Sequence, residues 1–195
     1  MCAGRTGQIV NYSSIGDDLG TSHNTVKSWM NVLETSNLIY RLRPFYENFS
    51  KQIVKSPKIY FCDTGLLCNL LGIEKADSIN RHFLKGGIFE NFVIGEFLKH
   101  RYNSGGEANF YFWRDKSGHE VDLLFEEGMN RKIIEMKAGR TISGDFFKGL
   151  DFYGGMDSRC PPENRYVVYG GNENQDRSRG RVRGWKRLGE IDLNF

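Results

Sequence analysis

Two acidic residues and one lysine stand in an order that suits metal-assisted hydrolysis. Asp122 lies in one strand-like run, and Glu135 and Lys137 lie in the next run along the chain. Because side chains alternate between the faces of a strand, Asp122 is expected to share a face with Glu120 and Leu124. Glu135 shares a face with Lys137 for the same reason. Neighbouring strands lie only about 5 Å apart, so the two runs can bring both carboxylates together.

Such a pair of carboxylates predicts a metal site. Close carboxylates repel each other unless a cation joins them, and Mg²⁺ prefers one or two carboxylates together with water and phosphate. We therefore expect Asp122 and Glu135 to hold Mg²⁺, or Mn²⁺ in its place. Lys137 would orient the attacking water and stabilise charge on the transition state of phosphodiester hydrolysis. The competing interpretation is a solvated cross-strand ion pair, which is the usual role of E-x-K on a strand.

A third carboxylate stands in the helix that is predicted over 87–101. Glu90 lies at helical spacing from Ile94 and Phe97, which places it on an apolar, core-facing stripe. An unpaired buried charge is costly, so Glu90 needs a cation as partner. It is either half of a structural ion pair, which the helix alone favours, or a further metal ligand or outer-shell base.

The elements that must position these groups follow from the hydrophobic pattern. We expect helices over 87–101 and 146–153, and strands over 109–114, 120–125, 131–137 and 165–169. In the second helix Phe146, Leu150 and Tyr153 share one face, and Lys148 points to solvent. Together these elements predict an α/β (α+β) domain with a central mixed sheet.

The first 75 residues carry a different pattern. A helix over 12–20 is expected to begin at a Ser13 or Ser14 cap and to end at Gly20, and a second helix follows over 21–35. The expected apolar face of the second helix consists of Val26, Trp29, Met30 and Leu33. Strands are expected over 38–45 and 58–62. Two helices, a tight turn and a hairpin predict a winged helix-turn-helix.

DNA binding is the functional interpretation of that winged helix. The candidate nucleic-acid-binding residues are Asn24, Lys27, Arg41, Arg43, Lys51 and Lys55, with His23, Ser28 and Lys58 beside them. However, residues 1–80 hold eight Lys and Arg against seven Asp and Glu. Because DNA binding depends on basic contacts to phosphate, a packing or docking role competes with DNA binding.

The basic residues are concentrated nearer the C-terminus. Residues 159–187 hold eight Lys and Arg against three acids, with Tyr169 and Trp185 among them, whereas the net charge of the whole chain is +3. This stretch is expected either to follow a phosphate backbone or to form a solvated loop and hairpin at a sheet edge.

Several classes of function are excluded or made improbable by what the sequence lacks. It contains no G-x-x-x-x-G-K-[ST] loop, so ATP hydrolysis by this chain alone is not expected. The longest apolar stretch, 64–73, is far shorter than the roughly 20 residues that cross a bilayer. Residues 1–7 lack an apolar leader segment. We therefore expect a cytoplasmic protein with no membrane partner.

The order of the candidate site residues resembles the PD-(D/E)XK nuclease superfamily. Glu90 on a helix precedes G-x-E-V-D at 118–122 and, twelve residues later, E-x-K within I-I-E-M-K at 133–137. Superfamily members place a helix, a strand with the Asp and a strand with E-x-K in that order. Val121 stands where the motif name has Pro, a position that varies widely. The resemblance implies a metal-dependent nuclease site made of the four matching residues, Glu90, Asp122, Glu135 and Lys137.

A narrower resemblance covers about residues 4–170. The chain is similar to the C-terminal region of prokaryotic predicted AAA+ ATPases that carry the domain of unknown function DUF4143. The segments that carry the likeness are 5–11, 24–34, 57–67, 88–98, 113–124 and 134–139. The resemblance implies a winged helix over 1–75, a nuclease-like DUF4143 domain over 76–195, and an ATPase module in cis or in trans.

The expected function is therefore that of a nuclease-like, nucleic-acid-binding part of an AAA+ ATPase. DNA is the expected substrate and phosphodiester hydrolysis with Mg²⁺ or Mn²⁺ the expected reaction. The alternative is a catalytically inactive module that couples the ATPase to DNA or to a protein partner, because folds are reused after catalysis is lost. Whether the chain is an enzyme stays open at this point.

Overall fold

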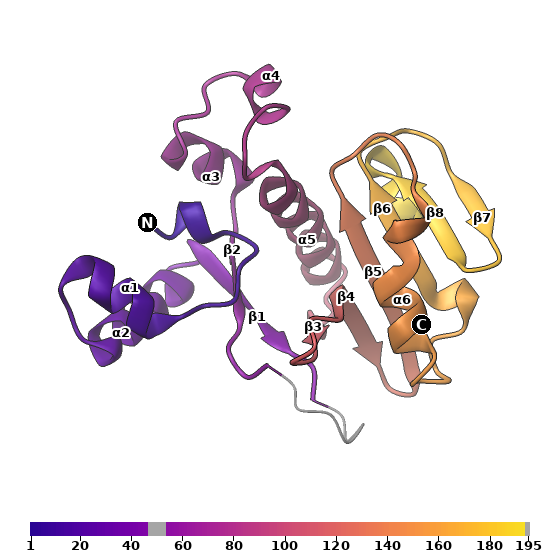
Figure 1. The fold of residues 1–195 in the computed structure, drawn as a ribbon, viewed down its shortest axis with the longest axis horizontal. Coiled ribbons are helices and arrows are strands. Elements are labelled where there is room, and N and C mark those ends of the chain that lie inside the picture. Colours follow the sequence, from indigo (N-terminus) through magenta and orange to yellow (C-terminus); the bar gives the residue numbers. More distant parts are fainter. Residues whose placement is uncertain (47–53, 194–195) are drawn as a thin grey trace.

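The computed structural model describes residues 1–46 and 54–193 (Figure 1). The first elements are η1 (Ala3–Arg5), α1 (Tyr12–Leu19), α2 (His23–Thr35), β1 (Ile39–Pro44), β2 (Lys58–Phe61), α3 (Thr64–Leu70), α4 (Ala76–Ile79) and α5 (Lys85–Asn103). The later elements are β3 (Phe110–Arg114), β4 (Glu120–Glu127), β5 (Asn130–Lys137), η2 (Gly144–Phe147), α6 (Lys148–Gly154), η3 (Pro162–Asn164), β6 (Arg165–Tyr169), β7 (Gln175–Arg177), β8 (Gly180–Gly184) and η4 (Trp185–Glu190). Each helix and strand expected from the sequence is confirmed, with the expected helix over 146–153 formed by η2 and α6.

The N-terminal helices differ from expectation in two details. The α1 cap is Asn11, whose side chain accepts a hydrogen bond from Ser14 N at 3.1 Å, so the expected serine cap is wrong. An Asn oxygen serves a free N-terminal amide as well as a serine does. Trp29, expected on the apolar face of α2, is 50% exposed, whereas Val26 and Met30 are buried. The buried face of α2 is therefore narrower than the spacing of its apolar residues predicted.

The described residues form one eight-stranded mixed sheet in the order β2-β1-β3-β4-β5-β6-β8-β7. β5, β6 and β8 run parallel, β3, β4 and β5 alternate in direction, and β1 pairs parallel with β3. The mixed α/β architecture expected from the sequence is thus confirmed. Figure 1 shows the β1–β2 hairpin toward one end of the molecule and the β7–β8 hairpin toward the other.

Helices cover both faces of this sheet. Leu123 of β4 packs in a buried cluster with Val93 and Phe97 of α5, whereas Leu124 packs in a second cluster with Leu150 of α6. α5 therefore lies on one face and α6 on the other, and this places the middle of the sheet between two helices. Within the described residues, no helix is long and apolar enough to cross a membrane.

A β-bulge interrupts β4 at the position of Asp122. Tyr111 of β3 pairs with Leu124, but Trp113 pairs with Val121, so β4 has one residue more than β3 between these pairs. Val121 and Leu124 consequently pack in the same cluster although they are three residues apart. We expected side chains to alternate regularly between the two faces of the strand, with Asp122 and Leu124 on the same face. That expectation is wrong, because a bulge changes the direction of the side chains at its position.

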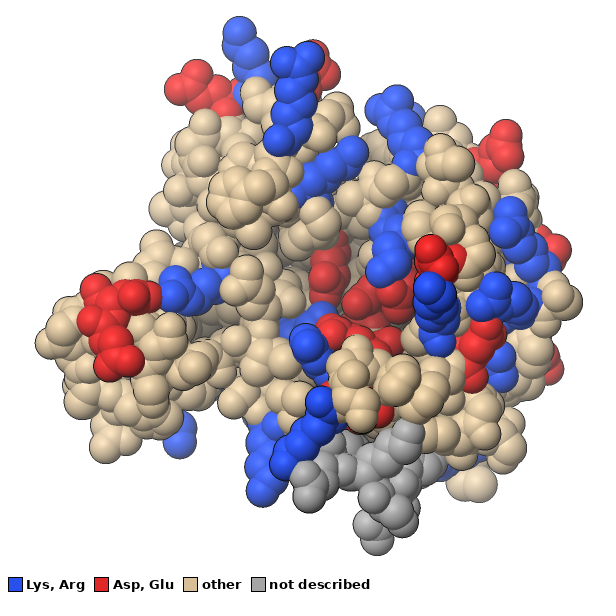
Figure 2. All heavy atoms as spheres, in the orientation of Figure 1, with Lys and Arg blue, Asp and Glu red and all other residues tan. Residues whose placement is uncertain are grey.

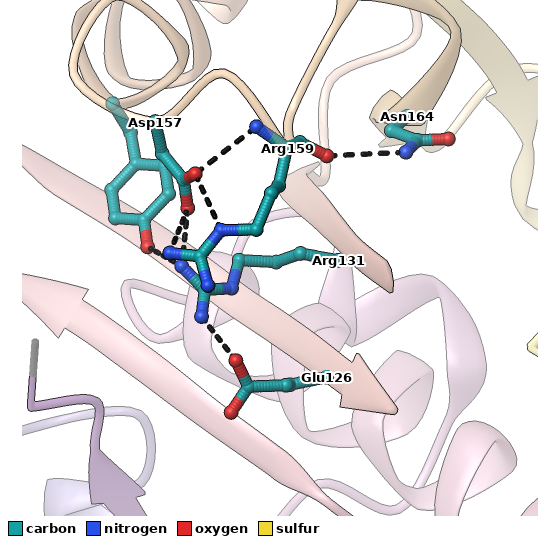
Figure 3. A network of polar contacts seen from close by, with 6 residues as sticks. Glu126, Arg131, Asp157, Arg159 and Asn164 are labelled. Carbon is teal, nitrogen blue, oxygen red and sulfur yellow. Dashed lines mark hydrogen bonds and ion pairs between the residues drawn. The ribbon is translucent and has the colours of Figure 1, made fainter. Parts of the chain in front are cut away.

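A buried polar network ties β5 to the turn after α6 (Figure 3). The Arg131 guanidinium, whose side chain is 1% exposed, donates to Glu126 and Asp157 and to the Tyr153 hydroxyl at 3.2 Å. Arg159 Nε donates to the same Asp157 carboxylate at 2.9 Å. Because the charges of Arg131 and Asp157 are both buried away from water, each depends on the other for compensation.

Replacing Asp157 with Asn is expected to lower the free energy of unfolding by about 3 kcal/mol at neutral pH, because Arg131 keeps a buried charge without its partner. Burial opposes the charge of Asp157, but hydrogen bonds from Arg159 and the charge of Arg131 together outweigh it and lower the pKa of Asp157. The stability from this group is therefore complete above its unfolded pKa and lost as pH falls through the lower folded pKa.

Urea unfolding at neutral pH and at about pH 2 measures this difference, which is expected to shrink in acid. Asp176→Asn is the matched control, since Asp176 pairs with Arg183 but is itself 70% exposed. Equal effects of the two substitutions at neutral pH would contradict the role given to burial.

Candidate functional site

The candidate site lies where β4 and β5 separate. Backbone pairing between the two strands runs from Glu127–Asn130 to Leu123–Ile134. At the next position the Asp122 side chain, and not the β4 backbone, bonds to β5. Met136 N donates to Asp122 Oδ2 at 2.8 Å. The bulge and this hydrogen bond together hold the Asp122 carboxylate in the gap between the two strands.

Glu90 meets the cation that its buried position requires. Lys58 Nζ of β2 lies 2.9 Å from Glu90 Oε1, and the Tyr60 hydroxyl donates to the same oxygen. The Lys58 side chain is 4% exposed. Burial alone would lower the pKa of Lys58, but the acidic groups around it raise that pKa well above its usual value. Lys58 therefore stays charged inside the protein.

Lys58 also reaches two carboxylates of β4. Its Nζ lies 2.5 Å from Glu120 Oε1 and 4.0 Å from Asp122 Oδ1. Glu120 contacts Arg114 as well, at 3.1 Å. The sequence placed Lys58 beside the candidate nucleic-acid-binding residues, but its side chain is buried among carboxylates instead. Lys58 and Tyr60 are two residues apart in a short apolar strand and so share one face. This spacing was the sequence feature that could have indicated a buried lysine.

Glu135 and Lys137 form an ion pair on the α6 side of the same gap. Glu135 Oε2 is buried and has no hydrogen-bond partner among the residues that the structure describes. Burial and the negative charge of Asp122 raise the pKa of Glu135 to about 8. Burial would lower the pKa of Lys137, but Asp122 and Glu135 raise it. The positive charge of Lys137 therefore compensates the Glu135 carboxylate only in part.

The close approach of α6 to this carboxylate depends on Gly149. A Cβ at Gly149 would overlap the carbonyl oxygen of Glu120 and would lie 3.4 Å from Glu135 Oε2. Only glycine leaves room there, so the helix can pack directly over the end of the gap. Figure 2 shows acidic side chains gathered in the hollow at the middle of this face, with Lys and Arg around them.

Two of the predicted ligands have the chemistry that a divalent cation prefers. Within residues 1–46 and 54–193, no three His, Cys, Asp or Glu side chains are grouped so that they could hold a metal ion by themselves. Asp122 and Glu135 remain, and one or two carboxylates completed by water and phosphate are the usual protein share of a Mg²⁺ site. The unpartnered Glu135 Oε2 supplies an oxygen with no other role in the described structure.

In the part of the chain that the structure describes, no predicted nucleic-acid-binding residue pairs with the carboxylates of this gap. Asn24 and Lys27 are exposed on α2. Arg41, Arg43 and Lys55 line one cavity of about 480 Å³ between α2 and the sheet, and Arg41 is held there by Glu34. Lys51 lies outside the described residues.

The basic C-terminal stretch forms a hairpin at the sheet edge and much of its charge is paired. Arg183 contacts Asp176, Arg179 contacts Asp151, and Arg187 contacts Glu190. The hairpin that the sequence offered as one interpretation of this stretch is present as β7 and β8.

Comparison with known families places the chain in a family of unknown function. Residues 85–187 match the domain of unknown function DUF4143, and this match covers more than half of the chain. The chain belongs to the DUF4143 family. Residues 1–77 match a separate domain of unknown function, DUF8612. The expected likeness over about 4–170 is thus divided between two domain families.

Two curated relatives extend the comparison. An uncharacterised protein of Mycobacterium bovis and one of Mycobacterium tuberculosis are each 29% identical to this chain over 143 residues. The aligned part is 73% of this chain and 32% of each relative, so the chain spans about one third of the length of these relatives. No solved structure matches the chain.

Proposed function

We propose that the DUF4143 region is a PD-(D/E)XK nuclease-like module that hydrolyses phosphodiester bonds with Mg²⁺ or Mn²⁺. The observation that carries the proposal is the meeting of Asp122, Glu135 and Lys137 where β4 and β5 separate. Glu135 Oε2 is buried there without a partner among the described residues. The order of Glu90, Asp122 and E-x-K on α5, β4 and β5 supports the same assignment.

The chain's own residues divide the work as follows. Asp122 and Glu135 bind the cation, and Glu90, which is bound by Lys58 and Tyr60, is an outer-shell base. Lys137 orients the attacking water and stabilises the negative charge that develops on the transferred phosphoryl group. A bound divalent cation would supply Lewis-acid polarisation of the phosphate and a more acidic water.

The proposed setting is a prokaryotic, cytoplasmic AAA+ ATPase of which this chain is the C-terminal part. The ATPase module would act in cis or in trans, and residues 1–75 would be a winged helix that binds DNA. Supporting observations are the order α1, α2, β1, β2 and the exposure of Asn24 and Lys27 on α2. The relatives' additional length leaves room for such a module.

A catalytically inactive docking module is the second candidate. One observation favours it: the Lys58 ammonium already lies among Glu90, Glu120 and Asp122 and compensates their charge without a metal ion. Nuclease-like folds that have lost catalysis can keep binding roles. In that case the module would couple the ATPase to DNA or to a protein partner.

Lys137→Ala is expected to slow DNA cleavage at least about 100-fold, because charge stabilisation in the transition state is lost. The assay uses purified protein with Mg²⁺ or Mn²⁺ and single- and double-stranded DNA. Lys148→Ala is the control, since that lysine on α6 is 75% exposed and pairs only with exposed Asp145 among the described residues.

The nuclease proposal fails if the wild-type protein cuts no DNA with either metal, or if Lys137→Ala and wild type cut at the same rate. Binding of DNA without cleavage would leave the docking module as the remaining candidate.

A further inference from the structure

A pocket of about 320 Å³ opens at the carboxyl ends of three parallel strands. Ala138 follows β5, Gly170 follows β6 and Trp185 follows β8, and all three line the pocket. The carboxyl ends of parallel strands are where open α/β sheets bind their ligands. The volume lies at the small end of the range for ligand pockets.

Aromatic rings form much of the pocket wall. Phe89 and Phe92 of α5 and Trp185 are half-buried and line it together. The Phe92 and Trp185 rings meet edge to face, with centroids 5.8 Å apart. Such a wall suits a flat, unsaturated ring, because aromatic side chains stack on any nucleobase.

Two cations stand at the pocket with no acidic partner in residues 1–46 and 54–193. Lys85 and Arg140 line it. Among the residues that the structure describes, neither side chain forms an ion pair, whereas Lys58, Lys137 and Arg131 are all paired. The positive charge at an otherwise apolar pocket is therefore available to a ligand. An apolar peptide segment would leave it unused, but a phosphate would not.

The pocket adjoins the proposed nuclease site. Ala138 is the next residue after Lys137, and neighbouring Cα atoms are about 3.8 Å apart. Phe89 directly precedes Glu90 on α5. The same helix and the same strand therefore supply both the pocket and the site, so one flexible strand of nucleic acid can occupy the two at once.

We propose that this pocket receives an unstacked nucleobase of single-stranded nucleic acid, with Lys85 and Arg140 holding the adjacent phosphates. The proposal rests on the proposed function and names its substrate class as single strands or unpaired ends. The base contacts the aromatic wall that Phe89 and Trp185 line, and this fixes which phosphate lies beside Lys137.

Binding of a fluorescein-labelled oligodeoxythymidylate, followed by anisotropy in buffer with EDTA, tests the pocket without requiring cleavage. Phe89→Ala and Trp185→Ala are each expected to weaken binding about tenfold. Lys85→Glu and Arg140→Glu are expected to weaken it at least as much and to reduce its salt dependence. Phe89→Ala and Trp185→Ala are expected to leave the binding of a blunt duplex within about twofold of wild type, because a paired base cannot enter the pocket.

Two controls match these variants. Lys99→Glu makes the same charge change near the other end of α5, where the side chain is 62% exposed. Tyr102→Ala removes an aromatic side chain that is 57% exposed near the C-terminal end of α5. Both are expected to bind within about twofold of wild type, since exposed positions outside the pocket contribute little. Circular dichroism shows whether each variant is folded, and the charge variants decide the outcome if Trp185→Ala is not.

The result separates this proposal from the nuclease proposal. If the oligonucleotide binds the folded pocket variants as it binds wild type, the base-binding pocket is overturned even if DNA is cut. Equal losses of single-strand and blunt-duplex binding in Phe89→Ala and Trp185→Ala overturn it as well. If DNA is never cut but the pocket variants lose binding, the nuclease proposal fails and the pocket stands.

Discussion

The Glu135→Gln protein is expected to cut DNA at least about 100-fold more slowly than wild type and yet to be more stable at alkaline pH. Glutamine keeps the shape of the side chain but removes the anionic oxygen proposed to bind the cation. Because Glu135 Oε2 is buried and unpartnered among the described residues, its charge costs stability whenever no cation is bound.

The pH dependence follows from the raised pKa of Glu135. Burial and Asp122 raise it from 4.5 to about 8, so the folded protein holds a proton that the unfolded chain releases. The stability that this proton gives is complete below pH 4.5 and lost as pH rises through about 8. The stability advantage of Glu135→Gln is therefore expected to grow across that window, measured by thermal unfolding in EDTA.

Glu163→Gln is the control, because the same change is made at an exposed position in η3. It is expected to alter neither cleavage nor the pH profile. A Glu135→Gln protein that is less stable than wild type at all pH values would show that this carboxylate is a structural ion-pair member, and the metal-ligand role would be lost with it.

Lys58→Met is expected to lower the free energy of unfolding by about 3–5 kcal/mol. Methionine fills similar space but leaves Glu90, Glu120 and Asp122 without the ammonium that compensates them. The same change is expected to increase the stabilisation by Mg²⁺, because a bound cation then replaces the lost charge. Thermal unfolding with and without Mg²⁺ measures both effects.

Lys55→Met supplies the comparison, since Lys55 is exposed and lies only three residues away. Its effect on stability is expected to be small. If the two variants unfold alike, the buried contacts of Lys58 do not contribute to stability as described. If Mg²⁺ stabilises Lys58→Met no more than wild type, the cation does not bind beside these carboxylates.

The helices and strands could be predicted from sequence because the hydrophobic pattern that indicates them is local. The strands β3 to β6 and the helix α5 follow from periodicity, and the demand of Glu90 for a cation follows from its place on an apolar stripe. The mixed sheet follows from these elements together. The exposed position of Lys148 on α6 follows from the same helical spacing.

The remaining features depend on contacts far apart in the chain. The bulge at Asp122 arises from how β3 and β4 pack and has no local marker in 118–122. The burial of Lys58 depends on Glu90, Glu120 and Asp122, which are more than 30 residues away. Helical periodicity predicted that Trp29 lies on the buried face of α2, but among the described residues no core packs over its side chain.

The parallel pairing of β1 with β3 has a consequence for how the two matched regions can be separated. β1 belongs to the DUF8612 match and β3 to the DUF4143 match, yet they are neighbours in one sheet. Removing residues 1–77 would leave β3 as a bare edge, which invites aggregation. It would also remove Lys58 from the acidic cluster. The boundary seen between two sequence families is therefore not a boundary of cooperative folding, and the two regions are expected to melt as one unit.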